Sequence, residues 1–350
     1  MVTGDHPATA RAVAREVGLI GEKESIVDGS HLPEDQEILG ALVDHDGAVI
    51  SRVTPENKLR IARALRKRGH VVAMTGDGVN DGPALQEASI GIVMGLSGTD
   101  VAREAADLVL LDDNFETIVA AIEQGRTTFA NTRRFLTYHL TDNVAELAPF
   151  VVWALSGGRF PLALGVLQVL CLDVGTDILP ALALGAEPPS PRALKGSRSL
   201  RHLIDRRLLF RAFGLLGPVE AFMEMTAFLL ALAAVGWRPG GPFPEGPSLL
   251  AASGAAFTAV VIGQMANAFA CRSATRWPGA IGWTGNRFLI KAVVVELLLL
   301  FVFLYFRPLA GILGQSPPNV AGAAIALLAF PAVLAADAIQ KRWASSRKRL

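Results

Sequence analysis

The stretch MTGDGVNDGPAL, from Met74 to Leu85, lies between an apolar run and a segment with helical spacing. It places Asp77 and Asp81 four residues apart, with glycines between and beside them. Glycine lets backbone N–H groups approach an anion closely, and Mg²⁺ binds a few carboxylates while keeping waters and phosphate oxygens in its shell. The spacing alone is equally consistent with a magnesium–phosphate site and with a polar turn at the end of a strand.

The residues around this loop alternate between apolar runs and helical patterns. Residues 55–69 begin with a proline, carry basic residues in the last turn and end at a glycine, which predicts a helix. Apolar strands alternating with helices predict a parallel sheet covered on both faces, and ligands bind at the carboxyl ends of such strands. The quoted loop is expected in that position. Strands are expected at 48–53, 70–74, 90–94 and 107–111, and further helices at 6–18, 83–88, 99–106 and 114–135.

The composition divides the chain into a charged part and an apolar part. The 350 residues are 51% hydrophobic with a mean hydropathy of +0.39, which is too apolar for an ordinary soluble protein. Residues up to about Arg134 read as a charged α/β domain, whereas long apolar runs dominate from Phe135 onward. One soluble unit and one membrane unit are therefore expected. The formal net charge of +1 offers no case for a nucleic-acid partner.

The apolar part contains six candidate membrane spans, each near the ~20 residues that cross a ~30 Å hydrocarbon core. Basic residues gather between spans two and three, between spans four and five, and after span six, whereas the alternate loops carry only Arg159, Arg238 and Arg307. The positive-inside rule then predicts a multi-pass protein of the cell membrane, with the N-terminal domain and the C-terminus in the cytoplasm. The expected spans are 136–156, 162–184, 208–235, 249–271, 288–306 and 320–339.

Polar side chains interrupt the first two spans. An acid near mid-membrane costs about 2.5–3.5 kcal/mol on insertion scales, so several together cost roughly 10 kcal/mol and point to a function. Their spacing of three and four residues places them on one face of each helix, where oxygens from two helices can converge on a hard cation. These residues are Asp142, Asn143, Glu146, Asp173, Thr176 and Asp177.

Two segments outside the quoted loop are also suited to phosphate. VTGD, residues 2–5, places Thr-Gly after an apolar residue and before a helical pattern, so a hydroxyl and a helix N-terminus could hold an anion. Lys58 lies in the first turns of its predicted helix, where its ammonium could reach the same phosphate. A lone lysine at such a place is more often a solvated surface residue.

Taken in order, TGD, RVTPENK and MTGDGVNDGPAL resemble the phosphorylation domain of P-type ATPases, which belongs to the haloacid dehalogenase superfamily. The segment GIVMGLSGTDVAREAADLVLLDDNFETI continues the likeness into the stalk. The resemblance implies Mg²⁺ and ATP as cofactors, and phosphoryl transfer by positioning and electrostatics. Its implied catalytic set is Thr3, Gly4, Asp5, Lys58, Asn80 and Asp81, with Mg²⁺ held by Asp77 and Asp81.

The apolar segments LTDNVAEL and LCLDVGTDILPALALGAEPP resemble membrane helices five and six of type II cation pumps. An aspartate at position 173 is similar to the sodium/potassium and proton/potassium branch, whereas Asp142 departs from both branches. Gln264 stands where reticulum-type calcium pumps have a glutamate, and Glu220 and Glu224 have no implied role. The transported ion (Na⁺ and K⁺, Ca²⁺ or H⁺) therefore stays open. The implied ligands are Asn143, Glu146, Asp173, Thr176, Asp177, Gln264, Asn267 and Glu296.

The resemblance implies a partial Rossmann-like α/β domain followed by an all-α, polytopic membrane domain of six helices. The membrane part would contact the lipid bilayer, and the helix at 114–135 would be a rigid connector. The expected divisions are the phosphorylation domain at 1–113, the stalk helix at 114–135, the ion-binding hairpin at 136–184, the C-terminal bundle at 185–340 and a basic cytoplasmic tail at 341–350.

One departure from the family is serious. The DKTGT motif with the phosphorylated aspartate is absent from these 350 residues, as are the expected nucleotide-binding and actuator domains. The chain therefore resembles the C-terminal portion of an ATP-driven cation pump whose N-terminal half is missing, and alone it is not expected to form a phosphoenzyme. The alternatives are a non-catalytic membrane subunit, half of a split pump and, less favoured, a membrane-anchored phosphatase.

Overall fold

The computed structural model describes residues 1–20, 26–76, 78–191, 193–194 and 202–346, and it separates into two compact units. The first unit contains Met1–Glu123 and Leu194–Arg201, and the second contains Gln124–Ala193 and His202–Leu350. Several residues named from the sequence lie outside the described ones: the expected Mg²⁺ ligand Asp77, and the basic residues Arg192, Lys195, Arg198, Arg201, Arg347, Lys348 and Arg349.

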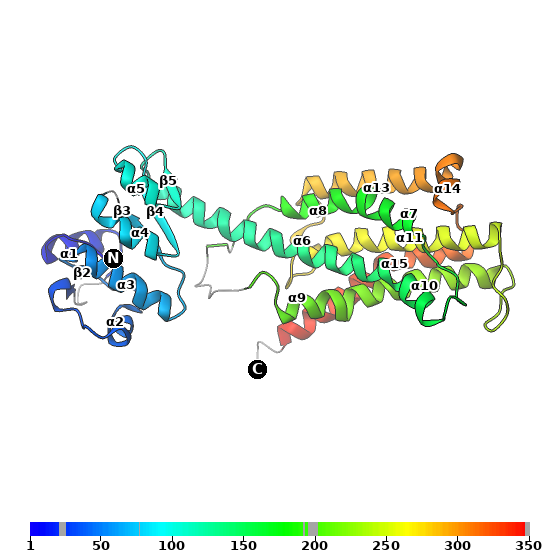
Figure 1. Ribbon diagram of the computed structural model, residues 1–350, viewed down its shortest axis with the longest axis horizontal. Coiled ribbons are helices and arrows are strands. Elements are labelled where there is room, and N and C mark those ends of the chain that lie inside the picture. The colour runs from blue at the N-terminus through cyan, green and yellow to red at the C-terminus, as the bar shows by residue number, and fades with distance from the viewer. Residues whose placement is uncertain (21–25, 77, 192, 195–201, 347–350) are drawn as a thin grey trace. The chain divides into compact units, whose positions relative to one another are not determined.

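The first unit is built from short parallel strands and helices (Figure 1). Its elements in chain order are α1 Pro7–Glu16, β1 Val27–Asp28, the 3₁₀ turn η1 Gly29–His31, α2 Gln36–Val43, β2 Ile50–Ser51, α3 Pro55–Lys67, β3 Ala73–Gly76, the 3₁₀ turn η2 Val79–Asp81, α4 Gly82–Glu87, β4 Ile90–Met94, α5 Asp100–Ala105 and β5 Leu108–Leu110.

The strands of this unit pair in parallel, as the alternating pattern predicts, but they form two sheets rather than one. β3, β4 and β5 pair in that order, while β1 pairs with β2, and Val2 forms a single bridge to Ile50. The strand expected at 70–74 was placed too early. Its ladder to β4 starts at Ala73, whereas the Val72 carbonyl before it accepts from the N–H groups of both Ser89 and Ile90, and the Val72 N–H donates to the Ser89 hydroxyl.

Local capping explains where the helices of this unit begin. The Thr54 hydroxyl accepts a hydrogen bond from the Asn57 N–H at 3.2 Å, and Pro55 occupies the first turn of α3. Asp35 caps α2 in the same way, and the N–H groups of Ile38 and Glu37 lower the pKa of its carboxyl. Short polar side chains at strand ends thus place α3 directly after β2, next to the residues expected to bind phosphate.

The second unit is a bundle of long helices. Its elements are the C-terminal part of α6 Phe115–Leu155, then α7 Val166–Cys171, the π-helical turn η3 Leu172–Asp177, α8 Ile178–Gly185, α9 Arg206–Arg211, the π-helical turn η4 Ala212–Leu216, α10 Gly217–Ala234, α11 Pro247–Cys271, α12 Pro278–Ile281, α13 Arg287–Tyr305, α14 Arg307–Leu313 and α15 Val320–Ser346.

Five helices of the described chain are long and apolar enough to cross a membrane, by length and composition. They lie within a few residues of the spans expected at 162–184, 208–235, 249–271, 288–306 and 320–339. The segment expected as the first span is helical, but it continues the stalk helix without a break as α6 and is not among the five. Crossing of the membrane by α6 stays a prediction. The five helical segments are Val166–Gly185, Arg206–Ala234, Pro247–Cys271, Arg287–Tyr305 and Val320–Ser346.

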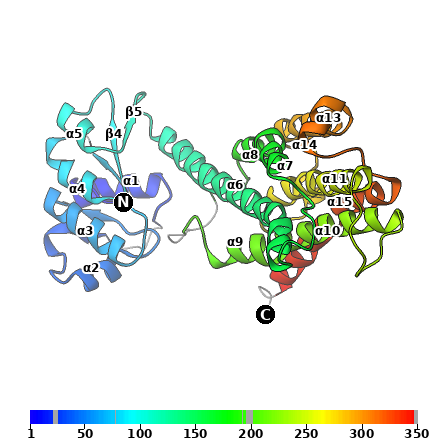
Figure 2. The ribbon, with the colours of Figure 1, turned by 45° about the vertical axis from the view of Figure 1, so that its right-hand side comes forward.

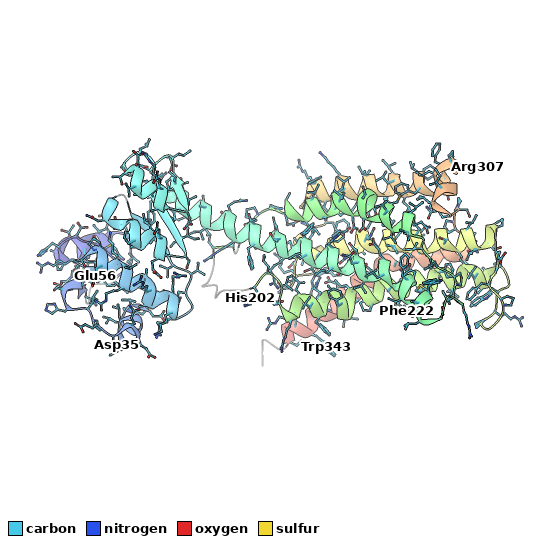
Figure 3. The ribbon with its side chains drawn as sticks, viewed as in Figure 1. Asp35, Glu56, His202, Phe222, Arg307 and Trp343 are labelled. Atoms are coloured by element: carbon cyan, nitrogen blue, oxygen red, sulfur yellow. The ribbon has the colours of Figure 1, made fainter. Side chains whose placement is uncertain are left out.

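Helices α10, α11 and α15 run side by side and form the centre of the bundle (Figures 1 and 2). α11 is buried along nearly its whole length, and its small residues permit the close approach. Gly322 of α15 lies against Ala255 of α11 and Ala231 of α10. By contrast, Phe222 projects outward from α10 and Trp343 from α15, both largely exposed, as expected for side chains that face lipid (Figure 3).

We expect Gly322→Ala to destabilise the bundle by about 1–3 kcal/mol, because the added methyl group overpacks a three-helix contact. The new Cβ would lie 2.7 Å from the Ala255 Cβ and 2.9 Å from the Ala231 Cβ. Thermal unfolding followed by circular dichroism in lipid nanodiscs measures the loss. Gly125→Ala in α6 is the matched control, since its Cβ meets open space and alanine favours a helix. Equal unfolding temperatures for the two variants would contradict the packing described here.

Candidate functional site

The residues expected to bind phosphate near the N-terminus lie beside β2. The Thr3 N–H donates to Ile50 O at 3.0 Å, and the Val53 N–H donates to Thr3 O at 3.0 Å. The Thr3 hydroxyl donates to Asp5 Oδ2 at 2.6 Å, so these two side chains form a local pair. Gly4 between them has no Cβ and leaves the backbone of this turn accessible. The turn therefore offers a hydroxyl, a carboxylate and the start of α1.

Lys58 and Asp81 are brought together by the fold, although they are far apart in the sequence. The Lys58 ammonium, on the second turn of α3, lies 2.8 Å from Asp81 Oδ1, and both side chains are largely buried. The other oxygen of Asp81, Oδ2, lies beside Gly76 and Gly78. A Cβ on Gly76 would lie 2.6 Å from the Asp81 Cβ, so glycine at the end of β3 is what allows this aspartate to sit against the strand.

Among the described residues, no hydrogen bond or ion pair links the Thr3–Asp5 pair to the Lys58–Asp81 pair. Thr3 and Asp5 contact each other, and Lys58 and Asp81 contact each other. Asn80 is exposed, and Asp77 lies outside the described part of the chain. The structure thus brings Thr3 to Asp5 beside β2 and Lys58 to Asp81 after β3, and the roles of these residues in phosphate binding remain proposals.

Three carboxylates converge in the helical bundle. One oxygen each from Glu146, Asp173 and Asp177 lies within 4.8 Å of the other two. Glu146 comes from α6, whereas Asp173 and Asp177 come from the π-helical turn η3. Glu146 and Asp177 are almost fully buried, and Asp173 is half-buried. A π-helical turn shifts the side chains that follow it relative to an α-helix, and such turns are frequent at functional sites.

Asp177 is held by two side chains of α6 that were not named from the sequence. The Tyr138 hydroxyl donates to Asp177 Oδ1 at 3.0 Å, and His139 Nδ1 lies 3.2 Å from Asp177 Oδ2. Tyr138 is fully buried. Tyr138, Asp142 and Glu146 recur every four residues, which places them on one helix face. That spacing, with the already named Asp142 and Glu146, was the available signal for Tyr138.

Helix α11 contributes amides to this region. Gln264 Nε2 donates to Glu146 Oε1 at 3.3 Å, and the Thr176 hydroxyl donates to Leu172 O at 2.9 Å and lies 3.1 Å from Gln264 Oε1. Gln264 therefore connects η3 to the carboxylate of α6. Both Thr176 and Gln264 are fully buried, and their oxygens lie beside the three-carboxylate cluster, so both are candidate cation ligands.

Other residues expected to bind the ion are placed differently. Asn267 donates to Asp142 Oδ1 at 2.8 Å and to Tyr138 O at 3.2 Å, so its amide supports Asp142 rather than the three-carboxylate cluster. Asn143 is half-buried and donates to His139 O of its own helix at 2.9 Å. Glu296 of α13 is buried and interacts electrostatically with Asp177, yet neither of its oxygens receives a hydrogen bond from the described residues.

Two family models match the chain. Residues 1–89 match haloacid dehalogenase-like hydrolases, and residues 161–343 match a family described as cation transporting ATPase, C-terminus. The first match covers Thr3, beside β2, and Lys58, on α3. The second covers η3, α11 and α13, which carry most of the oxygens gathered in the bundle.

The chain is also similar to curated proteins over most of its length. A calcium-transporting ATPase of Bacillus subtilis (strain 168) is 41% identical over 310 residues, which is 88% of this chain and 33% of that protein. The human sodium/potassium-transporting ATPase subunit alpha-4 is 39% identical over 268 residues, covering 68% of this chain and 26% of that protein. The rat alpha-2 subunit is 38% identical with the same coverage. The chain spans at most about a third of the length of these relatives.

Proposed function

Because the chain belongs to the family of cation-transporting P-type ATPases, we propose that it is the C-terminal part of an ATP-driven cation pump. The observation that carries the proposal is the convergence of Glu146, Asp173 and Asp177 in the bundle. Buried carboxylates without a lysine or arginine partner are costly in a membrane, and a hard cation compensates them. Transported Na⁺, K⁺, Ca²⁺ or H⁺ is the substrate of this site.

In the first unit, phosphoryl transfer is proposed to depend on positioning by Thr3, Gly4, Lys58 and Asp81. The Lys58 ammonium would neutralise charge on the transferred group, and the Thr3 hydroxyl would donate to one of its oxygens. The described residues fit Mg²⁺ by their chemistry: Asp81 supplies a largely buried carboxylate whose Oδ2 lies beside Gly76 and Gly78. Mg²⁺ bound there would polarise phosphate oxygens. Asp77 is proposed as its other carboxylate ligand.

The phosphorylated aspartate and most of the ATP-binding surface are proposed to come from sequence outside these 350 residues. α6 offers a route between chemistry and transport, since Glu146 lies on the same uninterrupted helix as the stalk residues from Phe115 onward. A displacement of this helix along or about its axis would move Glu146 relative to Asp173 and Asp177. We place the first unit and the C-terminus on the cytoplasmic side of the membrane, in keeping with the distribution of basic residues.

The test joins this chain to a front portion that carries a DKTGT aspartate, a nucleotide-binding domain and an actuator domain, in lipid vesicles. Phosphoenzyme formation from radiolabelled ATP is expected only with Mg²⁺ and with one of Na⁺, K⁺, Ca²⁺ or H⁺ as the activating ion. Lys58→Met should slow phosphorylation by about 10²–10³-fold, the usual loss when one charge-stabilising group is removed. Lys67→Met on the exposed end of the same helix is the matched control. Phosphorylation that no cation alters would refute the proposal.

A further inference from the structure

Glu220 of α10 lies where three helices meet. Gly217, one turn earlier, packs against Val144 of α6, since a Cβ there would lie 2.6 Å from the Val144 Cβ. On the other side, Gly263 of α11 lies under the Glu220 side chain, and its Cβ would meet the Glu220 Cγ at 3.2 Å. The two glycines let α10 approach both neighbours, and the Glu220 carboxyl comes within hydrogen-bonding reach of Asp142.

Most carboxylate oxygens of Asp142 and Glu220 at this junction have no hydrogen-bond donor among the residues that the structure describes. Asp142 Oδ1 accepts from Asn267, but Asp142 Oδ2 and both oxygens of Glu220 receive no hydrogen bond from any described residue. Asp142 is 0% exposed and Glu220 is 2% exposed. Two facing carboxylates cannot bond each other, because neither has a proton to donate when both are ionised. Three carboxylate oxygens at this junction are thus buried in the bundle without a hydrogen-bond partner among the described residues.

No basic side chain compensates this pair within the part of the chain that the structure describes. The buried cations of the bundle are engaged elsewhere: Arg211 and Lys341 pair with Asp337, and Arg272 pairs with Glu187. Removing ionised carboxylates from water without a counter-charge costs several kcal/mol for each of them. A ligand of opposite charge between Asp142 and Glu220 removes that cost.

We propose that Asp142, on α6, and Glu220, on α10, form a second cation subsite that binds a divalent ion. Asp142 lies one helical turn before Glu146 on α6, a spacing of roughly 5–6 Å between the two Cβ atoms. The proposed subsite is therefore separate from the Glu146–Asp173–Asp177 cluster. The pair supplies two negative charges and up to four oxygens, which suits Ca²⁺. Mg²⁺ is less suited, because it is reluctant to exchange its waters for protein oxygens in a buried site. Asn267 positions Asp142 by its amide. This subsite extends the proposed transport function and rests on it.

The experiment measures radiolabelled Ca²⁺ bound at equilibrium by the full chain in lipid nanodiscs. The wild-type chain should bind about two Ca²⁺, one at each carboxylate group. Glu220→Gln keeps the shape that packs on Gly263 but removes one charge, and it should lower the count to about one, as should Asp142→Asn. Glu245→Gln, in the exposed loop before α11, is the matched control and should bind as the wild type does.

Asp177→Asn distinguishes the two sites, because it should remove the other ion and leave the Glu220-dependent one. If Asp177→Asn leaves the number of bound Ca²⁺ ions unchanged while Glu220→Gln lowers it, the three-carboxylate cluster is rejected as a Ca²⁺ site and the Asp142–Glu220 subsite is kept. Unchanged Ca²⁺ binding in both Glu220→Gln and Asp142→Asn would overturn the second subsite, and would mean that the pair holds a proton instead. Loss of both Ca²⁺ ions in Glu220→Gln would contradict the proposal that the second subsite binds its ion independently of the three-carboxylate cluster. The ion retained by either variant also shows that the bundle has folded.

Discussion

Replacing Asp177 with asparagine is expected to lower cation affinity at the three-carboxylate cluster by about 10²–10³-fold. A unit charge about 4 Å from a cation contributes about 4 kcal/mol at an effective dielectric constant of 20, and each 1.4 kcal/mol is a factor of ten. Asparagine keeps one oxygen and the size of the side chain but removes the charge. Tyr138 and His139 would also lose the carboxylate that they contact at 3.0 and 3.2 Å.

Two measurements check this prediction. Direct binding of radiolabelled Ca²⁺ or Na⁺ to the chain in nanodiscs reports the affinity itself. In the pump completed with a front portion, Asp177→Asn should abolish ion-dependent phosphorylation from ATP. Glu245→Gln, an exposed acid of the same unit, controls for a general change in surface charge. Ion dependence that stays unchanged in Asp177→Asn would remove the assignment of this cluster as the transport site.

Replacing Glu187 with alanine is expected to destabilise the bundle by about 3–5 kcal/mol, because it strands a buried arginine. Arg272 is 2% exposed, and it contacts the Glu187 carboxylate through Nε at 3.0 Å and a terminal nitrogen at 2.8 Å. Asn286 donates to the same carboxylate at 2.7 Å. The pair therefore ties the chain after α8 to the end of α11 and the start of α13. Thermal unfolding of the chain in nanodiscs measures the loss.

A matched variant separates the charge from the hydrogen bonds. Glu187→Gln retains an oxygen for Arg272 and Asn286, so we expect it to lose less stability than Glu187→Ala does. Glu245→Ala, at an exposed position, should change the free energy of unfolding by no more than about 0.5 kcal/mol. An alanine variant at Glu187 that unfolds at the wild-type temperature would mean that this ion pair contributes nothing to holding the bundle.

Strand and helix positions near the residues proposed to bind phosphate followed from local signals. The strand expected at 90–94 matches β4, and the helix expected at 55–69 matches α3 to within two residues, because a proline, a threonine cap and a glycine bound it. The strand before the quoted loop was misplaced by three residues. Val71 and Val72 are apolar enough for a strand, but the ladder starts only where β4 provides partners.

The proposed ion site was harder to predict residue by residue. Its acids stood out because carboxylates are rare in apolar segments, and three of them do converge. The spacing of Asn143 and Glu146 suggested a shared face, yet Asn143 bonds its own helix while Asp142 faces Glu220. A difference of one residue rotates a side chain by about 100° around the helix, and a sequence does not say which neighbour that face meets.

From its sequence alone, this protein could be assigned a parallel α/β unit, a helical membrane unit and a family, because strand–helix alternation, apolar length and short phosphate motifs are local properties of the chain. The tertiary structure alone decided that Lys58 meets Asp81, that η3 turns Asp173 and Asp177 toward Glu146, and that Glu220 reaches Asp142. Each of these pairs joins residues from different elements, and their distance depends on how closely the packed helices and strands approach, which small residues such as Gly217, Gly263 and Gly76 determine.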